Sequence, residues 1–225
     1  MHFCPPHCKG AFRAWAVCIA LLPASVCGAS ELTASSGEEW NLSSRSESVS
    51  IYSRIRSGST IREFKAVGKI DAAPRAVLAV IDDIDAYAHF MPFISECRVL
   101  KHEGDSIISY QRVSPPFCTD RDYCLRVRHQ TRLTPAGRAY LCYWDLANDM
   151  GPAEKNDTVR VKINEGSWLI EPAAGNTALT TYRIYTDSGG ALPAWLANKA
   201  NQVAINKLFE AVRKQVKDSK YSVSP

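Results

Sequence analysis

The chain has 225 residues, of which 46% are hydrophobic and 22% are charged. These proportions match ordinary globular domains, so they argue against a disordered chain and against a protein with several membrane spans. The net charge of +4, from 27 Lys and Arg against 23 Asp and Glu, is small and dispersed. Nucleic-acid binding requires a clustered basic surface, so we expect no nucleic-acid partner. The length fits a single domain once any targeting segment is set aside.

The first thirty residues differ in character from the rest of the chain. Two basic residues precede the apolar run AWAVCIALLPASVCGA, which ends in small residues. This layout is typical of a secretory signal peptide, and we predict that residues 1–29 are removed, with cleavage after Gly28 or Ala29. The domain over 30–221 would then be periplasmic or extracellular. An uncleaved anchor, for which the run is short, and a lipoprotein acylated at Cys27 are the alternatives.

Four cysteines follow the predicted signal peptide, namely Cys97, Cys118, Cys124 and Cys142. In an oxidising compartment they allow two disulfides, with three possible connectivities. Free thiols buried inside strands are an equally good interpretation. None of the four has Cys-x-x-Cys spacing, so the spacing predicts no metal or redox site.

The part after the signal peptide begins with a polar, Ser-rich segment, for which we predict a short helix over 38–44. The alternating runs VSIYSRI (49–55) and IREFKAVGKI (61–70) predict a β-hairpin around the turn RSGST. In 71–93 the apolar residues recur every three or four positions, and Pro74 suits a first helical turn. We predict a helix of about 15 residues there.

Six runs with the alternation of strands follow, over 95–103, 106–114, 123–133, 138–146, 159–172 and 178–187. Gly or Pro at most of the joins favours consecutive antiparallel neighbours. The final 189–217 is a long helical pattern. Its apolar stripe is Leu196, Ala200, Val203, Ala204, Leu208, Ala211 and Val212. A curved antiparallel sheet around this helix, an α+β fold, accounts for the order of elements, whereas a lipocalin-like barrel would leave the helix outside.

Three stretches carry a family likeness: IREFKAVGKIDAAPRAVLAVIDDIDAYAHFMPF, YQRVSPPFCTDRDYCLRV and GGALPAWLANKANQVAINKLFEAVRK. In their order and spacing they resemble the START family, the lipid-transfer domains related to the steroidogenic acute regulatory protein, and above all its bacterial exported members. The resemblance covers 38–216. The triplet Arg121, Asp122 and Tyr123 and the segment LPAWLANK are its more specific pieces.

The resemblance implies a helix-grip fold, in which the sheet and the C-terminal helix enclose a hydrophobic cavity for one lipid or sterol. Most members of the family bind or carry lipids without chemistry, so we expect a non-enzymatic, monomeric protein with no cofactor. A related branch contains polyketide cyclases and aromatases, and an enzyme of that type acting on a bound hydrophobic substrate is the alternative.

Strand alternation selects candidate cavity residues. Tyr123, Leu125 and Val127 share the apolar face of their strand. Over 106–113 the pattern does not decide between the face of Tyr110 and Arg112 and the opposite one, and over 139–146 only one of Tyr143 and Trp144 can face inward. The candidate ligand-binding residues are Tyr110, Arg112, Arg121, Tyr123, Leu125, Val127, Tyr143, Leu196, Ala200 and Val203.

Asp120, Arg121 and Asp122 allow three interpretations: ion pairs that fix the start of a strand, an Arg121 that contacts a lipid head group, or a catalytic pair of carboxylates. The arginine argues against the last, because it keeps both carboxylates ionised. The resemblance implies a buried arginine six positions after Arg121, opposite an acid. Here those positions hold Val127 and Gln111, so the polar end of the cavity stays undefined.

Two further features bear on mechanism. Gly189, Gly190 and Pro193 precede the last helix and suit a hinge for cavity opening, and Trp195 beside them suits transient contact with a membrane. None of the histidines after the predicted signal peptide lies near a Ser or Cys in sequence in a way that suggests a nucleophile and its base.

Overall fold

The structure is a computed structural model that describes residues 39–116, 118–187, 189 and 194–222, with the backbone alone for 194–197. The predicted signal peptide over 1–29 and the hinge residues Gly190 and Pro193 lie outside these residues, so both remain predictions. In the described part no helix has the length and apolar character that crossing a bilayer requires.

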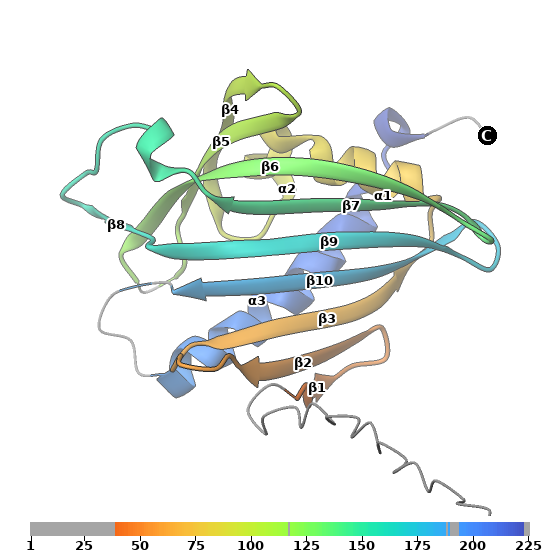
Figure 1. The fold of residues 1–225 in the computed structure, drawn as a ribbon, viewed down its shortest axis with the longest axis horizontal. Helices are drawn as coiled ribbons and strands as arrows, with labels where there is room; N and C mark the ends of the chain where they lie inside the picture. The colour runs from red at the N-terminus through yellow and green to blue at the C-terminus, as the bar shows by residue number, and fades with distance from the viewer. Residues whose placement is uncertain (1–38, 117, 188, 190–193, 223–225) are drawn as a thin grey trace, which may run out of the picture. The chain divides into compact units, whose positions relative to one another are not determined.

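Ten strands form one sheet (Figure 1). They are β1 (Asn41–Arg45), β2 (Val49–Ile55), β3 (Arg62–Ile70), β4 (Ile94–Glu103), β5 (Ser106–Val113), β6 (Asp120–Thr134), β7 (Gly137–Leu146), β8 (Thr158–Arg160), β9 (Ile163–Ala173) and β10 (Thr177–Asp187). The order across the sheet is β1-β2-β3-β10-β9-β7-β6-β5-β4, antiparallel throughout, and the short β8 pairs in parallel with β6.

The helices are α1 (Pro74–Asp82), α2 (Tyr87–Phe90) and α3 (Ala194–Gln215), with 3-10 turns at Ile84–Ala86, Asn148–Met150 and Ser219–Tyr221. α1 packs against β7, β9 and β10, and α3 packs against β2 and β3 (Figure 1). Both lie on the same face of the sheet, which we call the inner face. The predicted α+β fold, an antiparallel sheet around a C-terminal helix, is confirmed.

The hairpin and the later strands are confirmed with one exception: the run predicted over 159–172 divides into β8, which pairs with β6, and β9. The short helix predicted over 38–44 is wrong, and the helix predicted in 71–93 is shorter than expected. Residues 41–45 form β1, which pairs with β2 and is not helical. The predicted 15-residue helix breaks at Asp83, whose φ of −80° and ψ of 61° are not helical. The break follows from the sequence DDIDA, because aspartate is a poor helix former, and it allows Ile84 to be buried.

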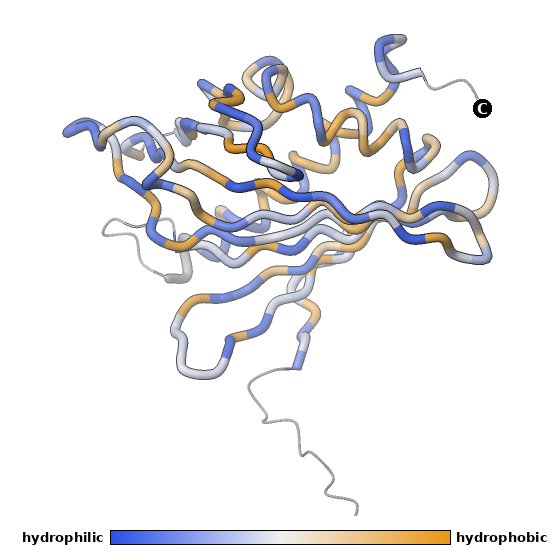
Figure 2. The backbone as a smooth tube through the Cα atoms, turned by 45° about the horizontal axis from the view of Figure 1, so that its top comes forward, coloured by the Kyte–Doolittle hydropathy of each residue, from blue (hydrophilic) through white to orange (hydrophobic). Residues whose placement is uncertain are grey.

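Alternation decides which side chains form the core. Apolar and polar residues alternate along the strands (Figure 2). On β3, Phe64, Ala66 and Ile70 point inward and are at most 1% exposed. On α3, Val212 of the predicted stripe is buried, but Ile205 and Phe209 are buried in place of the predicted Ala204 and Leu208, and Val203 is 42% exposed.

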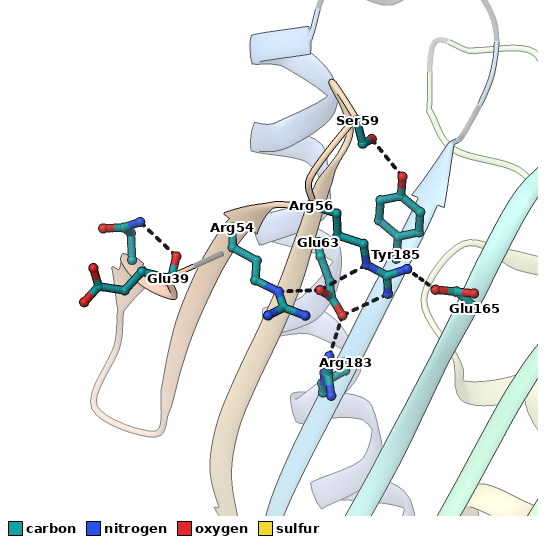
Figure 3. A network of polar contacts seen from close by, with 9 residues as sticks. Glu39, Arg54, Arg56, Ser59, Glu63, Glu165, Arg183 and Tyr185 are labelled. Atoms are coloured by element: carbon teal, nitrogen blue, oxygen red, sulfur yellow. Dashed lines mark hydrogen bonds and ion pairs between the residues drawn. The ribbon is translucent and has the colours of Figure 1, made fainter. Parts of the chain in front are cut away.

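A buried carboxylate ties together strands on the opposite, outer face (Figure 3). Glu63 of β3 is 2% exposed and accepts hydrogen bonds from Arg54 at 2.7 Å, Arg183 at 2.8 Å and Arg56 at 3.1 Å. Burial alone would raise the pKa of Glu63, but the three guanidinium groups outweigh it and lower the pKa to about 2. The carboxylate therefore stays ionised and joins β2, β3 and β10.

The four cysteines of the domain are free, so of the two interpretations left open the structure supports free thiols and not disulfides. Cys97, Cys124 and Cys142 are buried. Burial raises the pKa of Cys97 to about 12 and also raises the pKa of Cys124 and Cys142. These thiols are therefore protonated at neutral pH, as expected for structural cysteines in an apolar environment.

Candidate functional site: an internal apolar cavity

A cavity of about 740 Å³ lies between the inner face of the sheet and the helices. Its volume falls within the range of roughly 300–1,000 Å³ that is usual for small-molecule sites. The walls come from β4 to β7, β9 and β10, from the α1–α2 region and from α3. One internal space is thus bordered by six of the ten strands and by all three helices of the described residues.

The sheet side of the cavity follows from the two-residue repeat of the strands. On β6, Arg121, Tyr123, Leu125 and Val127 all line it. The neighbouring strands contribute the residues of matching parity: Gln111 and Val113, Cys142 and Trp144, Asn164 and Trp168, and Tyr182, Ile184 and Thr186. Most of this wall is aromatic or aliphatic, so it favours an apolar guest.

Gly166 of β9 explains how the large ring of Trp144 fits into this wall. A Cβ atom at position 166 would lie 2.5 Å from Cζ2 of Trp144 and 2.3 Å from the carbonyl oxygen of Arg183. Contacts this short are not tolerated, so only glycine permits the indole to lie over β9.

The cavity reaches the surface beside the first half of α3. Among its lining residues that the structure describes, Pro116, Lys199, Ala200 and Val203 are exposed. Phe93 borders the same space with a φ of 64°, a conformation that non-glycine residues rarely adopt, and Lys207 of α3 stacks over its ring at 5.0 Å. The loops after α2 and β5 therefore face α3 across the opening.

Two pairs of polar side chains on the wall are hydrogen-bonded to each other. The Tyr123 hydroxyl donates to Oε1 of Gln111 at 3.1 Å, and Nε1 of Trp144 donates to Oδ1 of Asn164 at 3.0 Å. Burial raises the pKa of Tyr123 and of Tyr182, so both phenols remain neutral. Because buried polar groups are costly when unpaired, these pairs let an otherwise apolar wall carry hydrogen-bonding groups.

The Asp120, Arg121 and Asp122 triplet divides between the two faces of β6. Asp122 is 1% exposed and holds Arg160 of β8 through contacts of 2.7 and 3.1 Å, and it accepts from the Tyr110 hydroxyl at 3.2 Å. Asp120 pairs with Arg112 at 2.6 Å. Arg121, in contrast, borders the cavity and donates to the backbone oxygen of Thr119. The carboxylates thus fix the start of β6, which matches the ion-pair interpretation, while the guanidinium lies on the cavity side.

The structure places most of the candidate binding residues on the cavity wall and moves three away from it. Arg121, Tyr123, Leu125, Val127, Ala200 and Val203 line the cavity. Tyr110, Arg112 and Tyr143 do not, and their predicted cavity position is wrong: they lie at the opposite parity, where Arg112 pairs with Asp120 and the Tyr143 ring lies near Arg128. The side chain of Leu196 is outside the described residues. Whether the six wall residues bind a ligand remains a prediction.

Sequence reasoning missed Gln111, Trp144, Asn164, Trp168 and Tyr182. A usable signal existed for Trp144. Counting back from the tight turn after Thr134 pairs Val127 with Trp144 in the β6–β7 ladder. Cross-strand partners point to the same face, so the apolar parity of β6 would have selected Trp144 over Tyr143.

Residues 70–213 match the family described as polyketide cyclase / dehydrase and lipid transport. The chain belongs to this family. Its likeness to START lipid-transfer domains is also confirmed: a STAR-related lipid transfer protein from Xanthomonas axonopodis superimposes with a TM-score of 0.70, at 26% identity over 80% of this chain and 99% of the other.

Two further proteins are similar to this chain in sequence. The phosphatidylcholine transfer protein of Homo sapiens is 26% identical over 178 residues, covering 77% of this chain and 82% of its own length. An uncharacterised protein of Pseudomonas aeruginosa is 26% identical over 162 residues, covering 72% and 78%. A Streptomyces aromatase/cyclase shares the fold alone, with a TM-score of 0.52 at 14% identity over 72% of this chain and 99% of the other.

Proposed function

We propose that this protein binds one lipid molecule in its internal cavity and carries it through an aqueous compartment outside the cytoplasm. The observation that carries the proposal is the apolar cavity of about 740 Å³. Its lining residues all lie within residues 70–213, which match the family described as polyketide cyclase / dehydrase and lipid transport.

The physical need for such a cavity follows from the hydrophobic effect. Exposing a lipid chain to water costs about 0.8 kcal/mol per methylene, or roughly 12 kcal/mol for a chain of about 16 carbons. Trp168, Leu125 and Val127 offer an apolar surface that removes most of that cost. The bonded polar pairs Tyr123–Gln111 and Trp144–Asn164, with Arg121, would face the more polar part of the guest.

The composition of the wall favours a carrier over a cyclase. General acid–base catalysis needs a group that exchanges protons near neutral pH. Among the lining residues that the structure describes there is no carboxylate and no histidine. Burial raises the pKa of the lining groups Tyr87, Tyr123 and Cys142 further from neutrality. An aromatase/cyclase activity is the alternative that the fold permits.

Loading requires an opening, and the first half of α3 is the segment we propose to move. Lys199, Ala200 and Val203 are exposed and border the cavity, and no side chain described over 198–204 is buried, so this part of the helix has few contacts that oppose opening. Gly189, with φ of 63°, lies just before it. Trp195 would meet the membrane while the lipid passes.

A vesicle transfer assay tests the proposal. Donor vesicles carry a fluorescent phosphatidylcholine in one arm and a fluorescent sterol in the other, and acceptor vesicles carry none. The full chain should accelerate transfer of one of the two at least ~10-fold. Val127→Trp fills the cavity from β6 and should abolish this, whereas Leu133→Trp, 77% exposed on the same strand, should not. Equal transfer by both variants would contradict the cavity as the carrier site.

A further inference from the structure

A cluster of three different side chains lies at one edge of the inner face, where α1 ends over β6 and β7. Asp82 is the last residue of α1, and His129 and Cys142 face each other across the β6–β7 ladder. One potential ligand atom from each, a carboxylate oxygen, a ring nitrogen and a thiol sulfur, lies within 4.8 Å of the other two. The strand register and the packing of α1 on β7 bring them together.

We propose that Asp82, His129 and Cys142 bind a divalent cation of the Zn²⁺ type. The ligand chemistry selects the metal, because thiolate and imidazole favour Zn²⁺ and its neighbours over Mg²⁺ and Ca²⁺, which prefer oxygen. Three protein ligands leave a fourth position for water or for an oxygen of a guest molecule.

The geometry needs only a small adjustment. With zinc–ligand distances of about 2.0–2.3 Å and tetrahedral angles, the three ligand atoms would lie roughly 3.4–3.6 Å apart. The present upper bound of 4.8 Å is about 1 Å longer. The hydrogen bond of 2.7 Å between His129 Nε2 and Asp82 Oδ1 would open as the ion enters between them.

Burial and exposure also suit a metal site. Cys142 is 3% exposed, and its burial raises the thiol pKa, but a bound cation deprotonates a coordinating thiol. The side chains of His129 and Asp82 are 30% and 36% exposed, which gives an ion access from solvent. An ordinary His–Asp pair does not require a buried thiol beside it, and that thiol distinguishes this cluster.

The site would connect the surface with the cavity. Cys142 lines the cavity, and Asp82 directly follows Ile81, which lines it too. A bound ion would therefore crosslink the end of α1 to β6 and β7 at the cavity wall. The spacing of residues along the chain does not predict this site, because His129 and Cys142 become neighbours only through strand pairing.

Cobalt titration tests the proposal with a readout of the ligands themselves. The reduced full chain is titrated with Co²⁺ without oxygen. We expect one Co²⁺ per chain at this site, with a thiolate-to-cobalt charge-transfer band that Zn²⁺ removes and Mg²⁺ does not. Cys142→Ser should abolish this contribution. His129→Gln and Asp82→Asn should each weaken binding at least ~10-fold, because losing even an outer partner of a metal typically costs 10–100-fold.

The controls separate this site from other thiols and from misfolding. Cys97→Ser removes a buried thiol outside the cluster and should leave the titration unchanged. All variants keep the four cysteines of the first 29 residues, so the difference between parent and Cys142→Ser isolates Cys142. His129 is partly exposed, so His129→Gln should keep the parent's circular dichroism. A parent spectrum without the band, or one unchanged in both Cys142→Ser and His129→Gln, would overturn the proposal.

Discussion

The two halves of α3 lie on the same sheet but contact it differently. In the second half Ile205, Phe209 and Val212 are buried against the core. Over 198–204 no residue is buried among those whose side chains the structure describes, and Ala200, Val203 and Ala204 border the cavity. The second half of the helix is an anchor packed on protein, although Ile205 and Leu208 also border the cavity, whereas the described part of the first half covers the cavity without a buried residue.

The anchor has specific partners. The Phe209 ring lies 5.3 Å from that of Trp168 and against Gly68 of β3. Arg213 donates to the backbone oxygens of Ser48 and Lys69, both at 2.8 Å. These contacts fix the second half to β3 and to the residue before β2, which is consistent with the proposed opening at the first half. One continuous helix thus has a second half that is packed on the sheet and a first half that lies over the cavity.

Truncating the anchor should have the largest effect on stability. Phe209→Ala removes a ring that is 0% exposed and should lower the free energy of unfolding by about 3–5 kcal/mol. Val203→Ala, in the cover, should change it by less than about 0.5 kcal/mol, because Val203 is 42% exposed. Urea denaturation of the two variants measures the contrast, and equal losses would break the distinction between the two halves.

The next largest effect is the pH dependence of stability that Glu63 contributes on β3, the strand against which the second half of α3 packs. Glu63 of β3 has a folded pKa of about 2 against an ordinary 4.5, so its ionisation stabilises the fold above about pH 5. The contribution, about 3 kcal/mol at neutral pH, should be lost as the pH falls from about 5 to 2. Glu63→Gln should remove most of this pH dependence in denaturation curves.

The matched control for Glu63 is Glu165, a carboxylate on the same face that also contacts Arg56. Its side chain is 46% exposed, and exposed ion pairs contribute little. Glu165→Gln should therefore retain the acid dependence of the parent. If both variants lost it, the dependence would belong to the arginine cluster in general and not to the buried carboxylate.

A smaller loss of stability is expected when a methyl group is added at Gly68, against the ring of Phe209. A Cβ atom at Gly68 would lie 2.9 Å from Cε1 of Phe209 and 2.9 Å from the carbonyl oxygen of Ser48. Gly68→Ala should therefore cost about 1–3 kcal/mol of unfolding free energy, typical of overpacked cores. In a double-mutant cycle, Phe209→Leu should relieve part of that cost. Strict additivity would show that the clash does not involve Phe209.

The smallest predicted effect is a local difference in amide hydrogen exchange in the first half of α3. Amide hydrogen exchange should be faster over 198–204 than over 205–213, because few buried contacts hold the first segment. Bound lipid should slow exchange in the first segment about 10-fold more than in the second. Mass spectrometry of exchanged peptides measures both, and uniform protection along α3 would argue for an opening elsewhere.

Strand periodicity predicted most of the fold, because a half-buried strand must alternate. It failed at β1, a polar edge strand whose side chains carry no alternation, and at Asp83, where a local break overrides a helical repeat. On α3 the apolar residues are abundant enough to allow several stripes. Only packing against Gly68 and Trp168 selects the one through Ile205, Phe209 and Val212.

The site was partly predictable for the same reason. β6 has one clearly apolar face, so Tyr123, Leu125 and Val127 were assigned to the cavity side correctly. β5 carries apolar residues on both faces and β7 carries aromatic residues on both, so their parity required the ladder register that places Gln111 opposite Tyr123. His129 and Cys142 are neighbours through the β6–β7 ladder, and Asp82 joins them through the position of α1, which no spacing along the chain reveals.

Native mass spectrometry of the purified protein tests most directly whether the hollow under α3 holds a guest. The account predicts a mass increase equal to one lipid molecule per chain, lost in Val127→Trp and retained in Leu133→Trp. A protein that never carries a lipid, even after incubation with phosphatidylcholine and sterol vesicles, or one that carries it equally well in Val127→Trp, would contradict the account.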